Sequence, residues 1–279
     1  MTAGGLFFVQ RVRKPAIASI VALVLVAAAC GSSSSKASNT TAGAGGEATT
    51  TAAPTLKGTI NVLAASSLTN AFTALGKDFE SAYPGTSVKF SFGSSATLVT
   101  QIRNGAPADV FASADQANMD KVVKAGDNAG TPQNIAKNKL EIAVAPGNPK
   151  QITSVADLAK PGIVVVLCDP SVPCGKFANQ VLANAKVTVT PKSREINVKA
   201  TLSKVTLGEA DAAIVYVSDV KSAGGKVEGV TIPDSINVLT TLPIVALKGS
   251  SHSDVATAWN NYVVAHQQEL VSQFGFLPL

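Results

Sequence analysis

The feature that most constrains the fold is a regular alternation of strand-like and helix-like segments, which begins at Gly58. The first run, TINVLAA (59–65), combines β-branched and apolar residues and predicts a strand. In the segment after it, the apolar side chains fall at helical spacing: Leu68, Phe72, Leu75 and Phe79. This helix should end at Pro84, because proline cannot continue a helix.

The same rhythm continues through most of the chain. Strands are predicted at residues 86–92, 108–114, 139–146, 162–168, 188–191 and 211–218, and helices at 94–105, 176–186 and 197–208. A further helix should begin with a capping box from Ser154 to Asp157. Alternating strands and helices predict an α/β fold with mainly parallel sheets, and the length of the alternating region favours two lobes and a cleft.

The N-terminal residues do not share this pattern. Basic residues precede an apolar run from Ala16 to Ala29, and Cys30 follows it directly. This arrangement predicts a secretory signal peptide (1–29), and its VAAAC ending resembles a bacterial lipoprotein signal, in which the cysteine becomes the lipid-bearing N-terminus. Residues 30–56 are small and polar and cannot bury a core, so they should form a flexible tether that spans on the order of 30 Å. We therefore expect an exported protein, anchored to the outer face of the cell membrane through Cys30.

Net charge argues against one class of partner. The sequence has 23 Lys and Arg residues and 18 acidic ones, but three of the basic residues precede Cys30. Removal of the signal leaves 20 basic residues against 18 acidic ones, so the mature chain is close to neutral. Nucleic-acid binding, which requires a strongly basic surface, is not expected.

Several predicted strands lead into helices through short polar turns. These turns lie at Ser66–Ser67, Ser94–Ser95, Cys174–Gly175 and Asn197–Val198. Each helix start leaves unpaired N–H groups and a partial positive charge, so several starts that meet at one cleft would form an anion site without lysine or arginine. Taken singly, each serine could simply cap its own helix. The repetition of the pattern favours the anion site.

The segment LCDPSVPCGKF (167–177) is the most constrained of these turns, because it holds two of the three cysteines together with two prolines and a glycine. Three roles are open for it: the nucleophile loop of an enzyme, a metal clip, or a rigid cradle for a small ligand. A thiol nucleophile needs a nearby base, but the only histidines are His252 and His266, both in the C-terminal segment. Zinc needs about four ligands, and two cysteines without a neighbouring histidine are a weak signal.

Four segments carry a family resemblance: LAASSLTNAF, FGSSATLVTQIRNGAPADVFASADQANMD, CDPSVPCGKFA and AAIVYVSD. In this order they resemble the periplasmic molybdate-binding proteins of ABC-type importers. The resemblance implies a type II periplasmic-binding-protein fold, in which two lobes are joined by two crossovers and close on a ligand in the cleft between them. On this basis we expect residues 57–140 plus 237–279 to form lobe 1 and residues 141–236 to form lobe 2.

The resemblance also implies a ligand set. Hydroxyl or backbone N–H groups would hold the oxyanion, and they belong to Ser67, Ser95, Cys174, Val198 and Tyr216. The doubled serine leaves open whether Ser66 or Ser67 is the first ligand, and we prefer Ser67. Many relatives have alanine at the position of Cys174, which does not change its backbone donor. Molybdenum would enter only as the bound oxyanion, with no cofactor and no other metal.

The chemistry of the ion agrees with this ligand set. Molybdate near neutral pH is a fully deprotonated dianion, so its site should offer N–H and O–H donors and exclude carboxylates. We predict a monomeric carrier, not an enzyme, which captures molybdate or tungstate and delivers it to the membrane permease of an ABC importer. The alternative cargo is sulfate or another tetrahedral oxyanion. The alternative class is a secreted serine hydrolase that uses Ser67 or Ser95.

The two cysteines of the constrained turn have a predicted role in this carrier. In an exported protein, Cys168 and Cys174 are expected to form a disulfide that closes a tight loop and contributes about 2 kcal/mol to stability. The bridge would hold the N–H groups of Cys174 and Gly175 toward the anion. Asp169, the one carboxylate near the loop, should be a turn residue that points away from the ligand.

Overall fold

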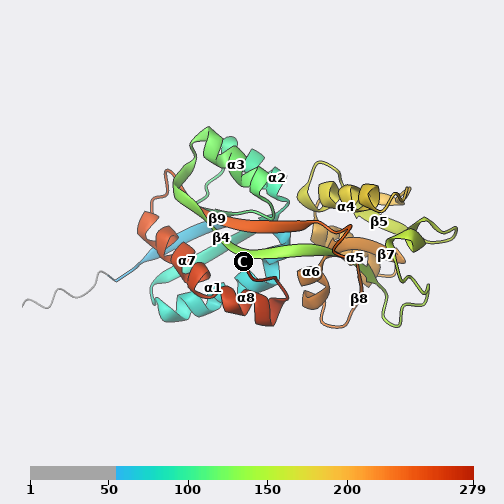
Figure 1. Cartoon of the computed structure of the whole chain (residues 1–279). Helices are drawn as coiled ribbons and strands as arrows, with labels where there is room; N and C mark the ends of the chain where they lie inside the picture. The colour runs from blue at the N-terminus through green and yellow to red at the C-terminus, as the bar shows by residue number, and fades with distance from the viewer. Residues whose placement is uncertain (1–54) are drawn as a thin grey trace, which may run out of the picture. The chain divides into compact units, whose positions relative to one another are not determined.

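The structure is a computed structural model that describes residues 55–279 (Figure 1). The predicted signal peptide, the lipidation at Cys30 and almost all of the predicted tether lie outside the described residues. The described residues belong to one compact unit. None of their helices is long and apolar enough to cross a membrane.

The first lobe begins with strand β1 (Gly58–Ala65), which pairs in parallel with β2 (Thr86–Gly93) and β3 (Val110–Ala112). Strand β9 (Leu239–Leu247) pairs with β3 in the antiparallel direction, so a late segment of the chain completes this sheet. The helices of this lobe are the 3₁₀ helix η1 (Ser66–Leu68), α1 (Thr69–Ala82), α2 (Ser95–Arg103), α3 (Gln116–Ala125), α7 (Ser253–Ala265) and α8 (Gln267–Phe274).

The second lobe is centred on β5 (Val165–Cys168), which pairs in parallel with β6 (Ser193–Glu195) and β7 (Ala212–Tyr216). Every residue of β5 and β7 is buried, as expected for parallel strands that are covered on both faces. The other elements of this lobe are the 3₁₀ helix η2 (Val155–Ala159), α4 (Pro173–Asn184), α5 (Val198–Thr206), α6 (Val217–Ser222) and β8 (Glu228–Thr231).

Strand β4 (Asn128–Val144) belongs to both lobes. Its residues up to Lys139 pair with β9, whereas Leu140 and the residues after it pair with β7 and β8. The chain returns to the first lobe between β8 and β9, through residues 232–238. Figure 1 shows β4 and β9 side by side, with α1 and α7 near one end and α4 and α5 near the other. This arrangement confirms the predicted two-lobed α/β fold.

Each lobe has its own apolar core. One buried cluster takes its residues from the segment 140–232, in the second lobe. In the first lobe, the predicted apolar face of α1 is fully buried and packs around Trp259. The rings of Phe72 and Phe79 meet that of Trp259 edge-on, with centroids 5.6 and 5.4 Å away. The first lobe has a second buried cluster around Met119, so each lobe packs around residues of its own, and the two chain connections leave room for a cleft between the lobes.

Two predictions from the strand pattern are wrong. The sheets are not mainly parallel, because β4 and β9 run antiparallel to every strand with which they pair. Residues 188–191 do not form a strand, and β6 begins only at Ser193. Pro191 has no N–H for a ladder, which disfavours a strand at that place. The capping box of Ser154 and Asp157 is present, but it opens a short 3₁₀ helix.

The aromatic cluster around Trp259 gives a prediction for stability. Replacement Phe79→Ala removes a fully buried ring that contacts Trp259 and Tyr262, and should lower the free energy of unfolding by about 3 to 5 kcal/mol. Fluorescence of the single tryptophan during denaturant unfolding measures this change. The control Val123→Ala alters a side chain that is 39% exposed and should shift stability by less than about 0.5 kcal/mol. Equal stability of the two variants would contradict this core assignment.

Candidate functional site

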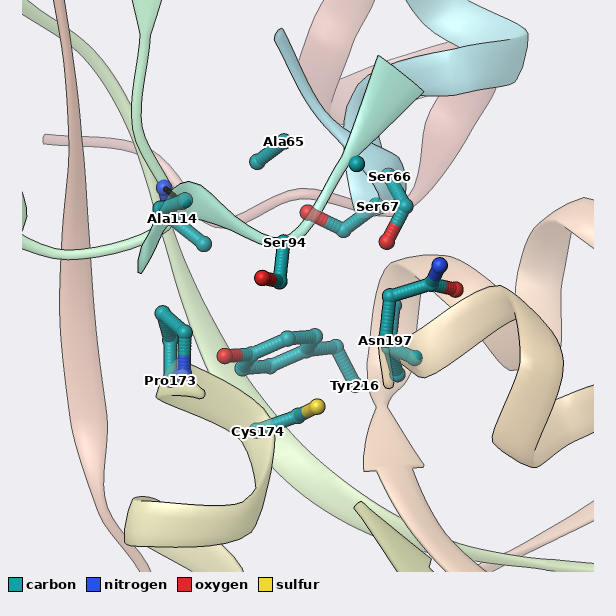
Figure 2. A pocket seen from close by; sticks show the side chains of 12 residues that line it. Ala65, Ser66, Ser67, Ser94, Ala114, Pro173, Cys174, Asn197 and Tyr216 are labelled. Carbon is teal, nitrogen blue, oxygen red and sulfur yellow. Dashed lines mark hydrogen bonds between the residues drawn. The ribbon is translucent and has the colours of Figure 1, made fainter. Parts of the chain in front are cut away.

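A small cavity lies between the two lobes. Its lining from the first lobe consists of Ala65, Ser66, Ser67, Gly93, Ser94, Ser95 and Ala114, and from the second lobe of Pro173, Cys174, Asn197, Val198 and Tyr216. Figure 2 shows the labelled side chains of the two lobes facing each other across this space. All five sequence-predicted ligand residues, Ser67, Ser95, Cys174, Val198 and Tyr216, are therefore brought together here.

Four helical segments begin at the wall of this cavity: η1 with its continuation α1, α2, α4 and α5. In α4 the first residue, Pro173, has no N–H, and the first i to i−4 bond is donated by Lys176 to Val172. The N–H groups of Cys174 and Gly175 precede that bond and have no acceptor within the helix. They carry the partial positive charge of the helix start to the cavity.

The start of α5 has the same construction. The Asn197 side chain accepts a hydrogen bond from the Ala200 N–H at 3.0 Å, and the Asn197 carbonyl accepts one from the Thr201 N–H at 3.1 Å. The N–H groups of Val198 and Lys199 come before these bonds, so they too lack acceptors within the helix. The starts of α4 and α5 in the second lobe thus face the same cavity as the serines of the first lobe.

Two hydroxyl oxygens at the cavity are buried and have no hydrogen-bond partner, namely those of Ser67 and Tyr216. A buried polar atom without a partner costs free energy, and in a ligand site it indicates where a ligand atom would bind. The Ser95 hydroxyl differs, because its oxygen accepts a hydrogen bond from the Ala114 N–H at 2.9 Å. Its own hydrogen remains available for a ligand acceptor.

The Tyr216 hydroxyl is held in its protonated form. Burial, together with the nearby carboxylates of Asp115 and Asp219, raises the pKa of Tyr216 well above its ordinary value. At neutral pH the group is therefore a hydrogen-bond donor that can serve an anion.

The cavity lining includes no charged side chain. Its polar atoms are hydroxyls, the Asn197 amide and backbone groups, so it offers donors to an anion and no carboxylate that would accept a hydrogen bond from a protonated one. Within residues 55–279 there is also no group of three or more histidine, cysteine or acidic side chains that could hold a metal ion. The site is suited to a fully deprotonated small anion.

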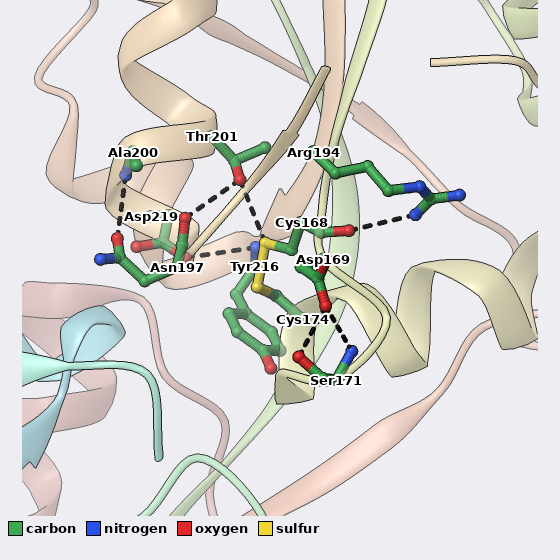
Figure 3. Close-up of a disulfide and its surroundings, with 10 residues drawn as sticks. All are labelled: Cys168, Asp169, Ser171, Cys174, Arg194, Asn197, Ala200, Thr201, Tyr216 and Asp219. Carbon is green, nitrogen blue, oxygen red and sulfur yellow. Dashed lines mark hydrogen bonds between the residues drawn. A yellow bond between two sulfur atoms is a disulfide. The ribbon is translucent and has the colours of Figure 1, made fainter. Parts of the chain in front are cut away.

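Cys168 and Cys174 form the predicted disulfide (Figure 3). Neither sulfur is then available as a nucleophile or a metal ligand. Of the three roles open for this turn, the rigid cradle for a small ligand is therefore the one that remains. The Cys168 sulfur lies 3.1 Å from the Thr201 hydroxyl, so the bridge also contacts α5. At Gly175 an added Cβ would collide with the Asp169 carbonyl oxygen, and only glycine allows this close approach.

Asp169 has the turn role that its sequence context predicts. Its carboxylate accepts hydrogen bonds from the Ser171 N–H and hydroxyl, at 2.9 and 2.6 Å, and it does not line the cavity. These bonds from Ser171, with a smaller effect of Arg194, lower the pKa of the Asp169 carboxyl. The negative charge is thus retained outside the cavity.

Sequence reasoning missed Ala114, which follows β3 and holds the Ser95 oxygen through its backbone N–H. Nothing in an alanine side chain marks such a role. The available signal was positional, because Ala114 comes at the carboxyl end of a predicted strand, where α/β folds place ligands.

Loss of the disulfide should lower stability without unfolding the chain. The variant Cys168→Ala/Cys174→Ala removes a cross-link between residues six apart, and its free energy of unfolding should fall by about 2 kcal/mol. Denaturant unfolding with and without a phosphine reductant measures the change. The reductant should act on the wild-type chain and leave the double variant unaffected. Mass spectra of unreduced peptides that show both cysteines as free thiols would contradict the bridge.

Comparison with known proteins places the chain in a family. The sequence model of the bacterial extracellular solute-binding proteins matches residues 60–277. The molybdate-binding protein ModA of Mycobacterium tuberculosis H37Rv is 44% identical over 219 residues, which cover 78% of this chain and 84% of that protein. Both matches extend over the two lobes and the cavity between them.

Solved structures agree on the fold. The periplasmic molybdate-binding protein of Azotobacter vinelandii superposes with a TM-score of 0.69 at 22% identity, over 79% of this chain and 99% of that one. The sulfate-binding protein SubI of Mycobacterium tuberculosis H37Rv gives a TM-score of 0.66 at 24% identity, over 79% and 87%. At these identities the likeness concerns the fold alone, whereas the sequence matches show that the chain belongs to the bacterial extracellular solute-binding proteins.

Proposed function

We propose that this chain is an extracytoplasmic carrier that binds molybdate or tungstate and delivers it to an ABC importer. Five groups hold the oxyanion: the hydroxyls of Ser67, Ser95 and Tyr216 and the backbone N–H groups of Cys174 and Val198. The relative that is 44% identical has the name of a molybdate-binding protein, which supports the choice of cargo. The chain acts as a carrier and not as an enzyme.

One observation carries this proposal. The Ser67 and Tyr216 oxygens, one from each lobe, are buried at the same cavity without hydrogen-bond partners. An ion between them would accept from both and remove the cost of leaving both donors unpaired. Because the two donors come from different lobes, a bound ion would also favour the closed arrangement of the lobes.

The chemistry of the lining supports a dianion that carries no proton. Phosphate near neutral pH retains a proton and needs an acceptor, and no carboxylate lines the cavity. Neutral donors bind a dianion through charge-assisted hydrogen bonds and helix starts, without a fixed positive charge. Such a site can release its cargo when the lobes separate, because opening removes about half of the donors.

The proposal extends to the cellular setting. The carrier is exported, is held at the outer face of the cell membrane by a lipid on Cys30, and works as a monomer with the membrane permease as its partner. Lobe 1 comprises residues 57–140 plus 237–279, and lobe 2 comprises residues 141–236. The strand pairing of β4 changes partner between Lys139 and Leu140, which supports this division.

Deletion of single hydroxyls tests the ligand set. The substitutions Ser67→Ala, Ser95→Ala and Tyr216→Phe each remove one charge-assisted hydrogen bond and should weaken molybdate binding by about tenfold to a hundredfold. Calorimetric titration measures the affinity, with Ser81→Ala as a matched control, since Ser81 is exposed on α1. The variant Ser66→Ala should bind nearly as the wild type if Ser67 is the first ligand. Unchanged affinity in all three hydroxyl variants would place the ligand elsewhere.

Titration of the wild-type chain with molybdate, tungstate and sulfate tests the cargo. Molybdate and tungstate are nearly equal in size and should bind alike. Sulfate is smaller and cannot reach every donor of a preformed cavity at once, so it should bind much more weakly. Tight sulfate binding would retain the donor set and overturn molybdate as the cargo.

A further inference from the structure

Two series of buried polar contacts, one behind the Ser95 half of the site and one behind the Tyr216 half, end on neighbouring strands. The first ends at Thr240 on β9 and the second at Asn138 on β4, and these two strands pair with each other. Thr240 is 6% exposed and Asn138 is fully buried, although neither lines the cavity. Polar side chains in such places require partners, and the identity of these partners suggests a role for them.

On the side of the first lobe, Thr240 holds the loop that follows β3. Its hydroxyl donates to the Ala114 carbonyl at 2.8 Å, across 126 residues of sequence. The N–H of the same Ala114 donates to the Ser95 hydroxyl oxygen at 2.9 Å. Thr240 therefore fixes the peptide group that follows Ala114, and the N–H of the peptide group that precedes Ala114 aligns the Ser95 donor.

On the side of the second lobe, Asn138 holds the start of α6. Its side-chain amide donates to the Ser218 hydroxyl at 2.8 Å, and both side chains are fully buried. The next residue, Asp219, accepts a hydrogen bond from the Tyr216 N–H at 3.3 Å (Figure 3). Tyr216 ends β7, which pairs with Leu140 of β4, and the Ser218 contact adds a second attachment of this junction to β4.

The two attachments meet on neighbouring strands. Asn138 and Thr240 are opposite each other in the antiparallel register of β4 and β9. Each attachment joins buried partners, so a shift of either half-site away from these strands would leave a polar atom buried and unpaired. In the structure both attachments are formed, and Ser67, Ser95 and Tyr216 line the same cavity.

We infer that Thr240 and Ser218 are positioning residues, which hold the donors of the two lobes in register through the paired strands β4 and β9. The inference rests on the proposed function, because its measure is the affinity for the oxyanion. Neither side chain would touch the ion. Both act through the peptide groups that place the Ser95 and Tyr216 hydroxyls.

The test uses substitutions that keep shape and remove one hydroxyl, Thr240→Val and Ser218→Ala. Each should weaken molybdate binding by about threefold to tenfold, the size of one neutral hydrogen bond. The lower affinity should come mainly from faster dissociation of molybdate, because the substitutions disturb the alignment of the hydroxyl donors in the closed complex. Thr240→Ser and Ser218→Thr retain the hydroxyl and should recover most of the affinity.

The matched control is Thr86→Val. Thr86 is 9% exposed, and its hydroxyl donates to the Tyr83 carbonyl at 2.8 Å, away from the cavity and from the paired strands. This variant should lose melting temperature without losing affinity. Stopped-flow and calorimetric titration with molybdate, together with thermal unfolding of the ligand-free variants, provide the measurements.

The outcomes separate this inference from the proposed function. If the wild type binds molybdate and both Thr240→Val and Ser218→Ala retain its affinity within about twofold, the two residues serve stability alone and the inference is overturned. If the wild type binds only another tetrahedral oxyanion, the same ratios measured with that ion decide the inference, while the cargo is revised. If the wild type binds no oxyanion, the proposed function and this inference fail together.

Discussion

The antiparallel pairing of β4 with β9 is the interaction on which the rest of the structure depends. The 17 residues of β4 are long enough to join the first-lobe sheet at one end and the second-lobe sheet at the other. Each lobe then completes its own core around this shared strand. Because the two lobes are joined by only two extended segments, the space between them stays open to a ligand, and helix starts from both sides can face it.

The candidate site makes use of groups that the fold leaves unpaired. A helix start has N–H groups without intrahelical acceptors, and four helical segments begin at the cavity. Buried hydroxyls add further donors, while the acidic side chains near the site are held outside the lining by bonds of their own. An anion is therefore attracted by oriented dipoles and not by a fixed cation. Such a site favours an anion that carries no proton, and it can bind that anion reversibly.

An ion pair between the buried Asp219 and the partly exposed Lys199 supports the second half of the site. Asp219 is fully buried behind Tyr216, and burial raises the pKa of its carboxyl, whereas the Lys199 ammonium 3.4 Å away opposes that rise. Lys199 follows Val198 at the start of α5, so the pair connects this helix to the start of α6, directly after Tyr216. A buried carboxylate without such a partner would be costly, which gives the lysine a structural reason to lie close to an anion site.

The sequence by itself determined much of this protein. Helical spacing predicted α1, strand-to-helix turns predicted which backbone groups would meet at a cavity, and two cysteines six residues apart predicted the disulfide. These signals are local, because they depend on residues within a few turns of each other. They also gave the fold class, although whether the five residues at the cavity bind the ion stays a prediction.

Only the tertiary structure decided the direction of the paired strands and the contacts behind the site. The first part of β4 contains glycine, proline and several polar residues, so no periodic pattern predicted a strand there. The partners of Thr240 and Asn138 lie 126 and 80 residues away in sequence. A hydrogen bond across such a separation exists only once the lobes have folded around β4 and β9, and no local propensity can encode which distant group will be its acceptor.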